Sequence, residues 1–273
     1  MKTFEGLLLC TDLDGTLLRN DATISAENLR AIEHFKAEGG TFTFITGRMP
    51  YFVRHIYETI QPNAPFCCVN GGGIYDHRTG EYLWKRELPP AALDLLEYIA
   101  DHIDDIGIQI NTFSRIFFCR ENSTMAGFRK VTGVPNLICS PREVTEPIGK
   151  IVFGDHREEV LMKVQSLLLS HPRADKFDFI RSDRCLYEIL PKGNSKGTVL
   201  SRLAELLHMD PAKTIAVGDY YNDVDMLRTA QCGIAVGNAC ADAKTAANHI
   251  TVTNEEHAIA RIISDIEHGI LQI

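Results

Sequence analysis

The 273-residue sequence contains no apolar run of the roughly 18 residues that a membrane-spanning helix requires. Its first residues, MKTFEGLLLC, lack an extended apolar segment and a small-residue cleavage site, so no secretory signal is predicted. The formal net charge is −8, which gives no general affinity for nucleic acids or anionic membranes. We therefore expect a soluble, cytoplasmic protein with no nucleic-acid partner and no membrane partner.

Paired cysteine motifs are also absent. The eight cysteines are scattered and form no C-x-x-C pair, which argues against structural zinc and against a disulfide framework. The ten histidines form no spaced cluster, so surface or capping roles are expected for them rather than metal ligation. A nucleotide-triphosphate loop is not predicted either, because GNSKG at 193–197 lacks the G-x-x-x-x-G-K-[ST] spacing.

What is present is an ordinary globular composition, with 45% apolar and 23% charged residues. At both ends of the chain, short apolar runs alternate with helical periodicity, which predicts a parallel sheet covered by helices. The expected strands are 6–11, 41–46, 65–69, 213–217 and 232–236, and the expected helices are 25–38 (with Ser25 as N-cap), one starting near Pro50, 195–208, 221–230 and 256–268.

The pattern changes near residue 80, where paired strands joined by short turns begin. Expected helices are 89–103, 123–132 and 157–170, and expected strands are 107–112, 115–120, 149–154, 176–181 and 185–190. Such pairs favour an antiparallel sheet with helices on one face. The prediction is therefore an α/β fold: a discontinuous domain of residues 1–80 and 191–273 with a doubly wound, mainly parallel, Rossmann-like sheet, and an inserted α+β domain at 81–190.

Polar residues follow the predicted parallel strands where each strand ends, and ligands bind at that edge of open α/β sheets. These residues are Asp12 and Asp14 after the first strand, Thr46, Gly47 and Arg48 after the second, Asp219, Asn222 and Asp223 after strand 213–217, and Lys196 at a helix start. Two carboxylates about 4 Å apart repel by about 4 kcal/mol at an effective dielectric constant of 20. The pairing of Asp12 with Asp14 therefore predicts a nearby cation.

These residue types suit phosphoryl transfer. Mg²⁺ is usually held by one or two carboxylates with waters and phosphate oxygens, and Asp12 and Asp219 could supply them. One carboxylate can attack phosphorus, and a second carboxyl two residues on can protonate the leaving oxygen and later activate water. The Thr46 hydroxyl, the N–H groups of a glycine turn and the Lys196 ammonium would complement the phosphoryl charge.

Four ordered segments, D-L-D-G-T at 12–16, I-T-G-R at 45–48, S-K-G at 195–197 and G-D-Y-Y-N-D at 218–223, resemble the motifs of the haloacid dehalogenase superfamily. The position and size of the insertion, the N-G-G turn before it and V-G-N-A at 236–239 resemble the Cof-type phosphatases with a C2B cap. The resemblance covers essentially the whole chain. One departure is Tyr220, where relatives commonly have asparagine, and it puts the lining of the site in doubt rather than the chemistry.

The resemblance implies a role for each matching residue. Asp12 would be the nucleophile and Asp14 the general acid/base. The resemblance further implies that Mg²⁺ is held by Asp12, the Asp14 carbonyl and Asp219, with Asp223 supporting the metal or its waters. Phosphate would be bound by the Leu13 backbone, Thr46, Gly47, Lys196 and Asn222.

The function expected from these observations is a Mg²⁺-dependent phosphatase that forms an aspartyl-phosphate. Its partner would be a small phosphorylated metabolite, either a sugar phosphate or a nucleotide-related phosphomonoester, and the protein would be a monomer or weak homodimer. The insertion would close over the site, with loops near Asn111 to Arg115 and Arg181 to Arg184 setting specificity. Two alternatives are a phosphohexomutase and a phosphate-binding regulator without turnover, and Asp14 argues against the regulator.

Overall fold

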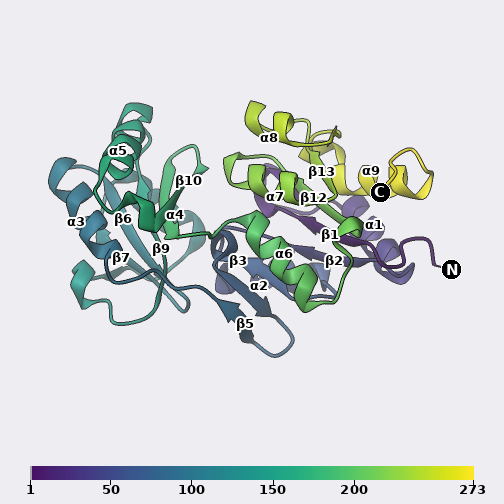
Figure 1. Ribbon diagram of the computed structural model, residues 1–273, viewed down its shortest axis with the longest axis horizontal. Helices are drawn as coiled ribbons and strands as arrows, with labels where there is room; N and C mark the ends of the chain where they lie inside the picture. Colours follow the sequence, from purple (N-terminus) through teal and green to yellow (C-terminus); the bar gives the residue numbers. More distant parts are fainter. Residues whose placement is uncertain (1) are drawn as a thin grey trace. The chain divides into compact units, whose positions relative to one another are not determined.

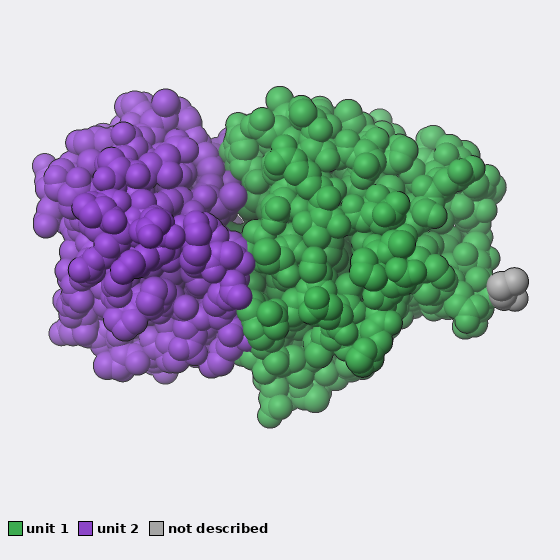
Figure 2. All heavy atoms as spheres, viewed as in Figure 1, with its two compact units in different colours: residues 1–84, 195–273 green, residues 85–194 purple. Residues whose placement is uncertain are grey.

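The computed structural model describes residues 2–273 (Figure 1). The chain divides into two compact units, which Figure 2 distinguishes by colour. Unit 1 contains the chain up to Trp84 together with Ser195–Ile273, and unit 2 is the continuous stretch Lys85–Asn194. Within the described residues, every helix is too short or too polar to cross a membrane.

Unit 1 is built on a five-stranded sheet in the order β14-β13-β12-β1-β2, and all its strands are parallel. The strands are β1 (Leu8–Thr11), β2 (Thr41–Phe44), β12 (Thr214–Gly218), β13 (Cys232–Ala235) and β14 (His249–Ile250). Leu8 of β1 is in register with both Thr41 of β2 and Thr214 of β12. These three neighbouring strands therefore end on the same side of the sheet, where the predicted site residues follow them.

Helices cover both faces of this sheet (Figure 1). They are α1 (Ala26–Ala37), α2 (Arg54–Ile60), α6 (Lys196–Leu206), α7 (Val224–Thr229), α8 (Ala241–Ala246) and α9 (Ala258–Glu267). Val199 of α6 and Met226 of α7 belong to the same apolar cluster as Cys10 of β1. On the other face α9 is tied to α1 by the Ala260 N–H, which donates to the Asn28 side chain at 3.0 Å.

The predicted N-cap of α1 is confirmed, since the Ser25 hydroxyl accepts the Asn28 N–H at 3.2 Å. The predicted helix 221–230 is instead a single turn, Tyr221–Asp223, followed by α7. The turn is separate because Asp223 accepts the backbone N–H groups of Asp219 and Tyr220, both at 3.0 Å, and so caps it. The helix expected from Pro50 likewise begins as a tight turn, Pro50–Val53, before α2.

A small antiparallel sheet follows β2 along the chain, and two of its strands were not predicted. It contains β3 (Phe66–Cys68), β4 (Gly73–Asp76) and β5 (Glu81–Lys85) in that order. Only β3 was expected from its apolar residues, and its expected place in the parallel sheet is wrong, because it pairs antiparallel with β4 and meets the segment after β2 only through the isolated bridge Ile45–Cys67. β5 was missed because its residues alternate between exposed and half-buried, so that no face of the strand is fully buried.

Unit 2 contains a six-stranded sheet in the order β10-β11-β9-β6-β7-β8, antiparallel except for the β7–β8 pair. Its strands are β6 (Gly107–Thr112), β7 (Ile116–Arg120), β8 (Leu137–Ile138), β9 (Ile148–Gly154), β10 (Phe177–Asp183) and β11 (Leu186–Pro191), and its helices are α3 (Ala92–His102), α4 (Ser123–Thr132) and α5 (Glu158–Ser170). The predicted fold class, a parallel α/β core with an inserted α+β part, is confirmed.

The expectation that all helices of unit 2 lie on one face of its sheet is wrong. α3 and α5 pack with Ile108 and Phe153 in one apolar cluster. A Cβ added to Gly107 or Gly154 would project from the opposite face of the sheet and come within 2.6 Å of Met125 of α4. Two glycines at facing positions of β6 and β9 thus make room for α4 on the second face.

Candidate active site

The first site segment is a wide turn directly after β1. The Asp12 N–H donates to the Val217 carbonyl of β12 at 2.8 Å, which continues the sheet by one residue. The chain then turns, and the Leu18 N–H donates to the Leu13 carbonyl at 2.8 Å. Gly15 has φ +74°, and a Cβ at this position would lie 2.6 Å from Asp219 Oδ2. A glycine here lets the turn approach the second acidic segment closely.

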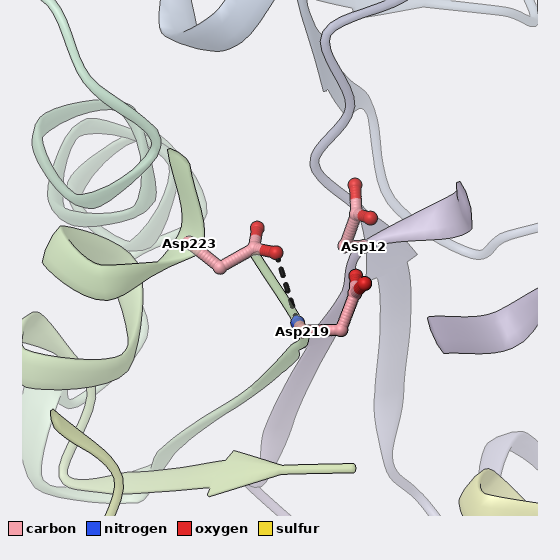
Figure 3. A group of neighbouring side chains, drawn as sticks. All are labelled: Asp12, Asp219 and Asp223. Atoms are coloured by element: carbon pink, nitrogen blue, oxygen red, sulfur yellow. Dashed lines mark hydrogen bonds between the residues drawn. The ribbon is translucent and has the colours of Figure 1, made fainter. Parts of the chain in front are cut away.

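Three of the predicted acidic residues form one cluster. Asp12, Asp219 and Asp223 each place a carboxylate oxygen within 4.8 Å of the others, and Figure 3 shows them converging from two segments far apart in the sequence. Asp12 follows β1, whereas Asp219 follows β12 and Asp223 lies in the next turn. The Thr16 hydroxyl donates to Asp219 Oδ1 at 2.9 Å and holds that side chain against the first turn.

Lys196 neutralises part of this cluster. Its Nζ lies 2.6 Å from Asp12 Oδ1 and 2.6 Å from Asp223 Oδ1. The lysine is 1% exposed, and its two partners are 6% and 0% exposed. The buried Lys196 ammonium makes a charge-assisted hydrogen bond to each of the two buried carboxylates. These strong bonds fix the position of the Asp12 oxygen.

Burial and mutual repulsion make it costly in free energy for all three carboxylates of the cluster to be ionised at once. Burial raises the pKa of Asp12 well above its usual value, with Lys196 opposing that shift and Asp223 adding to it. Burial and the neighbouring Asp223 raise the pKa of Asp219 to about 7. Burial alone would lower the pKa of Lys196, but the attraction of Asp12 and Asp223 outweighs it and the net shift is upward.

The donor set fits a small hard cation. Mg²⁺ takes oxygen ligands and is held in proteins by one or two carboxylates, which Asp12 and Asp219 provide at the cluster. Asp223 has both carboxylate oxygens in use, one with Lys196 and one with backbone N–H groups. It is therefore placed to support the neighbouring side chains.

Asp14 lies apart from the acidic cluster. Its carboxylate forms a two-point ion pair with Arg48, with Nε to Oδ2 at 2.8 Å and Nη2 to Oδ1 at 2.5 Å. The side chains are 56% and 32% exposed for Asp14 and Arg48. The structure thus joins the first predicted segment to the second through Arg48, which the sequence interpretation had left outside the catalytic set.

The second and fourth predicted segments are connected by Asn70. The Asn70 N–H donates to the Thr46 carbonyl at 3.1 Å, and its side-chain oxygen accepts the Asn222 amide at 3.1 Å. A Cβ on Gly47 would lie 2.8 Å from that same oxygen. All four predicted segments are therefore brought together in unit 1, at the ends of β1, β2 and β12.

Sequence reasoning treated Asn70 only as part of a turn. Its φ of +50° agrees with the turn that the N-G-G sequence predicts, but its contacts with Thr46 and Asn222 were not predicted. Asn238 was also missed, and its amide donates to the Gly15 carbonyl at 2.7 Å. In unit 2, two arginines of the loops expected to set specificity are paired, Arg115 with Glu146 at 2.8 Å and Arg181 with Glu158.

Comparison with known proteins identifies the class of protein to which this fold and site belong. Residues 9–263 match the haloacid dehalogenase-like hydrolase family. The chain belongs to this family, as its motifs predicted. The predicted enzyme class, a phosphoric monoester hydrolase, is confirmed by this match and by the phosphatases among its relatives.

Individual relatives are similar along nearly their whole length. The 5-amino-6-(5-phospho-D-ribitylamino)uracil phosphatase YitU of Bacillus subtilis is 27% identical over 265 residues, covering 94% of this chain and 96% of that protein. A haloacid dehalogenase-like hydrolase from Bacteroides thetaiotaomicron is 27% identical in sequence, with a TM-score of 0.79 over 95% of this chain and 99% of that one. The subclass IIB sugar phosphatase BT4131 shares the fold, with a TM-score of 0.83 at 21% identity over 97% of this chain and all (100%) of that one.

Proposed function

We propose that this protein is a Mg²⁺-dependent phosphatase that hydrolyses a small phosphorylated metabolite through an aspartyl-phosphate on Asp12. The observation that carries the proposal is the Asp12 carboxylate, held at 2.6 Å by a buried lysine within a cluster of acidic oxygens at the ends of parallel strands. In this proposal unit 1 is the catalytic core and unit 2 is the cap.

Asp12, the Asp14 carbonyl and Asp219 would hold Mg²⁺, with Asp223 in support. When bound, the ion neutralises the acidic cluster and the charge on the transferring phosphoryl group. Lys196 orients the Asp12 oxygen, and the Leu13 backbone, Thr46, Gly47, Lys196 and Asn222 would bind the phosphate oxygens. Asn70 supports this arrangement because it contacts both Thr46 and Asn222.

In the proposed mechanism Asp14 carries out two proton transfers. In the first step an Asp12 oxygen bonds to phosphorus, the ester P–O bond breaks, and protonated Asp14 gives its proton to the leaving oxygen. In the second step the Asp14 carboxylate takes a proton from a water whose oxygen attacks phosphorus, and the bond from phosphorus to Asp12 breaks. Asp12 is then a free carboxylate and inorganic phosphate is released.

A substrate with a small hydroxyl-bearing leaving group agrees best with the relatives. YitU is named for a phosphorylated ribitylamino compound, and the structural relative BT4131 is described as a sugar phosphatase. These names support a sugar phosphate or a nucleotide-related phosphomonoester for this chain. The cytoplasmic location and the monomeric or weakly dimeric state remain predictions.

The test is phosphate release from a panel of phosphomonoesters by the purified protein, with Mg²⁺ and with EDTA. We expect turnover only with Mg²⁺, and its loss in Asp12→Asn. Asp21→Asn is the matched control, because Asp21 is an exposed aspartate that hydrogen bonds only within its own loop, to Thr23. Full activity in Asp12→Asn would contradict the proposal, and isomer formation from a hexose phosphate without phosphate release would identify a mutase instead.

A further inference from the structure

Three consecutive residues in unit 1 have a left-handed backbone. Val69, Asn70 and Gly71 follow β3 directly, with φ of +55°, +50° and +91°. Glycine adopts such angles freely and asparagine fairly often, whereas for a β-branched residue they are a strained exception. Within residues 2–273, Val69 is the only β-branched residue with a positive φ, and no other three consecutive residues have one. We call Val69–Gly71 the left-handed turn.

The left-handed turn is buried and holds the segment that follows β2. The Val69 N–H donates to the Arg48 carbonyl and the Asn70 N–H donates to the Thr46 carbonyl, both at 3.1 Å. These two bonds fix the backbone on either side of Gly47. Local strain of this kind persists only where the surrounding structure maintains it, and it is concentrated at functional sites.

The last residue of the left-handed turn packs against the start of α6. A Cβ on Gly71 would overlap the Ser195 carbonyl oxygen and lie 3.3 Å from the Lys196 backbone nitrogen. Ser195 caps α6, and Lys196 is the first residue of that helix, with its Nζ 2.6 Å from Asp12 Oδ1. Because only glycine allows this approach, the left-handed turn determines where α6 begins and thereby where Lys196 lies.

The Asn70 side chain reaches a third segment of the site. Its Oδ1 accepts an N–H of the Asn222 amide at 3.1 Å. An amide nitrogen carries two N–H donors, so this bond orients the Asn222 amide and leaves its second N–H for another acceptor. The left-handed turn therefore contacts the three separate segments that contain Thr46, Lys196 and Asn222.

We propose that the left-handed turn is a positioning element that sets the spacing of the phosphate-binding groups of Thr46, Lys196 and Asn222, an inference that rests on the proposed phosphatase function. The turn does not touch phosphate itself and acts through these three residues. Donors from three segments must converge on one phosphoryl group, and a misplacement of about 1 Å can lower a rate by about 10²-fold. In this proposal, contacts with all three segments offset the strain of the left-handed backbone.

The experiment measures the Kd of inorganic phosphate by phosphorus NMR titration in the presence of Mg²⁺, for wild type and Asn70→Gly. The variant loses the acceptor for Asn222, but glycine adopts a φ of +50° without strain, so the fold should be kept. We expect Kd to rise about tenfold and kcat/KM for a phosphomonoester to fall by a similar factor. The Mg²⁺ concentration for half-maximal activity should stay the same. A purely structural role would lower the melting temperature without this selective loss of phosphate affinity.

Asn222→Ala tests whether the Asn70 side chain acts through Asn222. If it does, the double variant should bind inorganic phosphate little more weakly than Asn222→Ala alone, because the two side chains form one unit. If the losses of affinity of the two single variants added in full, Asn70 would act independently of Asn222 and the inference would be overturned.

Gln61→Gly is the matched control. Gln61 also has a left-handed backbone, with a φ of +48°, but it is exposed at the end of α2 and lies outside the four predicted segments. This variant should keep the wild-type Kd and kcat/KM. If Asn70→Gly is folded and also keeps the wild-type Kd, the inference is overturned while the phosphatase function stands. If the wild-type protein neither binds inorganic phosphate nor releases it from any ester, the proposed function fails and the inference fails with it.

Discussion

At the scale of single residues, Gly15 shows how closely the two acidic segments approach each other. An added Cβ would lie 2.6 Å from Asp219 Oδ2, and the backbone has φ +74°. We expect Gly15→Ala to destabilise the protein by about 1–2 kcal/mol and to lower kcat sharply, because Asp219 must move. Urea denaturation and steady-state kinetics measure both effects.

The control for this change is Gly127→Ala. Gly127 lies in α4, and an added Cβ would meet no atom within 4 Å. Alanine should stabilise that helix by up to about 1 kcal/mol without affecting kcat. Equal losses of activity in Gly15→Ala and Gly127→Ala would show that the contact with Asp219 is unimportant.

Arg48 provides a second prediction at this scale. Its two-point contact with Asp14 fixes the orientation of the proposed acid/base. A positioned acid/base contributes roughly 10²–10⁴ to the rate, so Arg48→Met should lower kcat by about tenfold or more and alter the pH–rate profile, with Arg48→Lys retaining part of the activity. Arg54→Met removes another arginine–carboxylate pair, Arg54 with Glu58, in which the side chains are 73% and 61% exposed, and it should leave kcat unchanged. An unaltered kcat in Arg48→Met would rule out this positioning role.

At the scale of elements, the Lys150–Glu188 pair links β9 to β11 in a buried environment. Lys150→Met alone should destabilise the protein by about 3–5 kcal/mol, because Glu188 is left buried without its cation. The double variant with Glu188→Met should recover most of that stability. Urea denaturation of the two single variants and the double variant measures the coupling energy between Lys150 and Glu188. If the losses in free energy of unfolding of the single variants simply added in the double variant, the prediction would be wrong.

The elements themselves show what can be predicted from the sequence. The parallel strands β1, β2, β12 and β13 were predictable because each is a short apolar run followed by polar residues, whereas the two-residue strand β14 was not predicted. Asp12 and Asp219 were found from their places after such strands, and Lys196 from its place at the start of a helix. β5 was not predictable, because its partial burial depends on its neighbours in the sheet. The contacts of Asn70 with Thr46 and Asn222, and of Arg48 with Asp14, were not predictable either. They join segments far apart in the sequence, which come together only when the turns after the strands have folded.

At the scale of the whole molecule, Asp219 makes stability depend on pH and on Mg²⁺. Because burial and Asp223 raise its pKa to about 7, the folded protein keeps a proton on Asp219 that the unfolded chain loses near pH 4. Between these two values the folded state binds the extra proton, so the contribution of Asp219 to stability falls as pH rises. A bound cation favours the carboxylate and opposes this fall.

The measurement is urea denaturation at pH 5 and pH 8, with EDTA and with Mg²⁺. In EDTA, wild-type protein should lose stability relative to Asp219→Asn between the two pH values, and Mg²⁺ should reduce that relative loss. Asp101→Asn, at an exposed position of α3, is the control for removing a surface charge. The prediction would be contradicted if wild type and Asp219→Asn differed in their free energy of unfolding by the same amount at pH 5 and at pH 8.

The order of strands in unit 1 also determines when this protein can fold during its synthesis. β1 lies between β2 and β12, yet β12 is more than two hundred residues further along the chain. Unit 2 is one uninterrupted stretch with its own apolar cluster, so the ribosome releases all of it before β12 emerges. The nascent chain therefore carries Asp12 on an incomplete sheet, and its acidic cluster assembles only as translation nears its end.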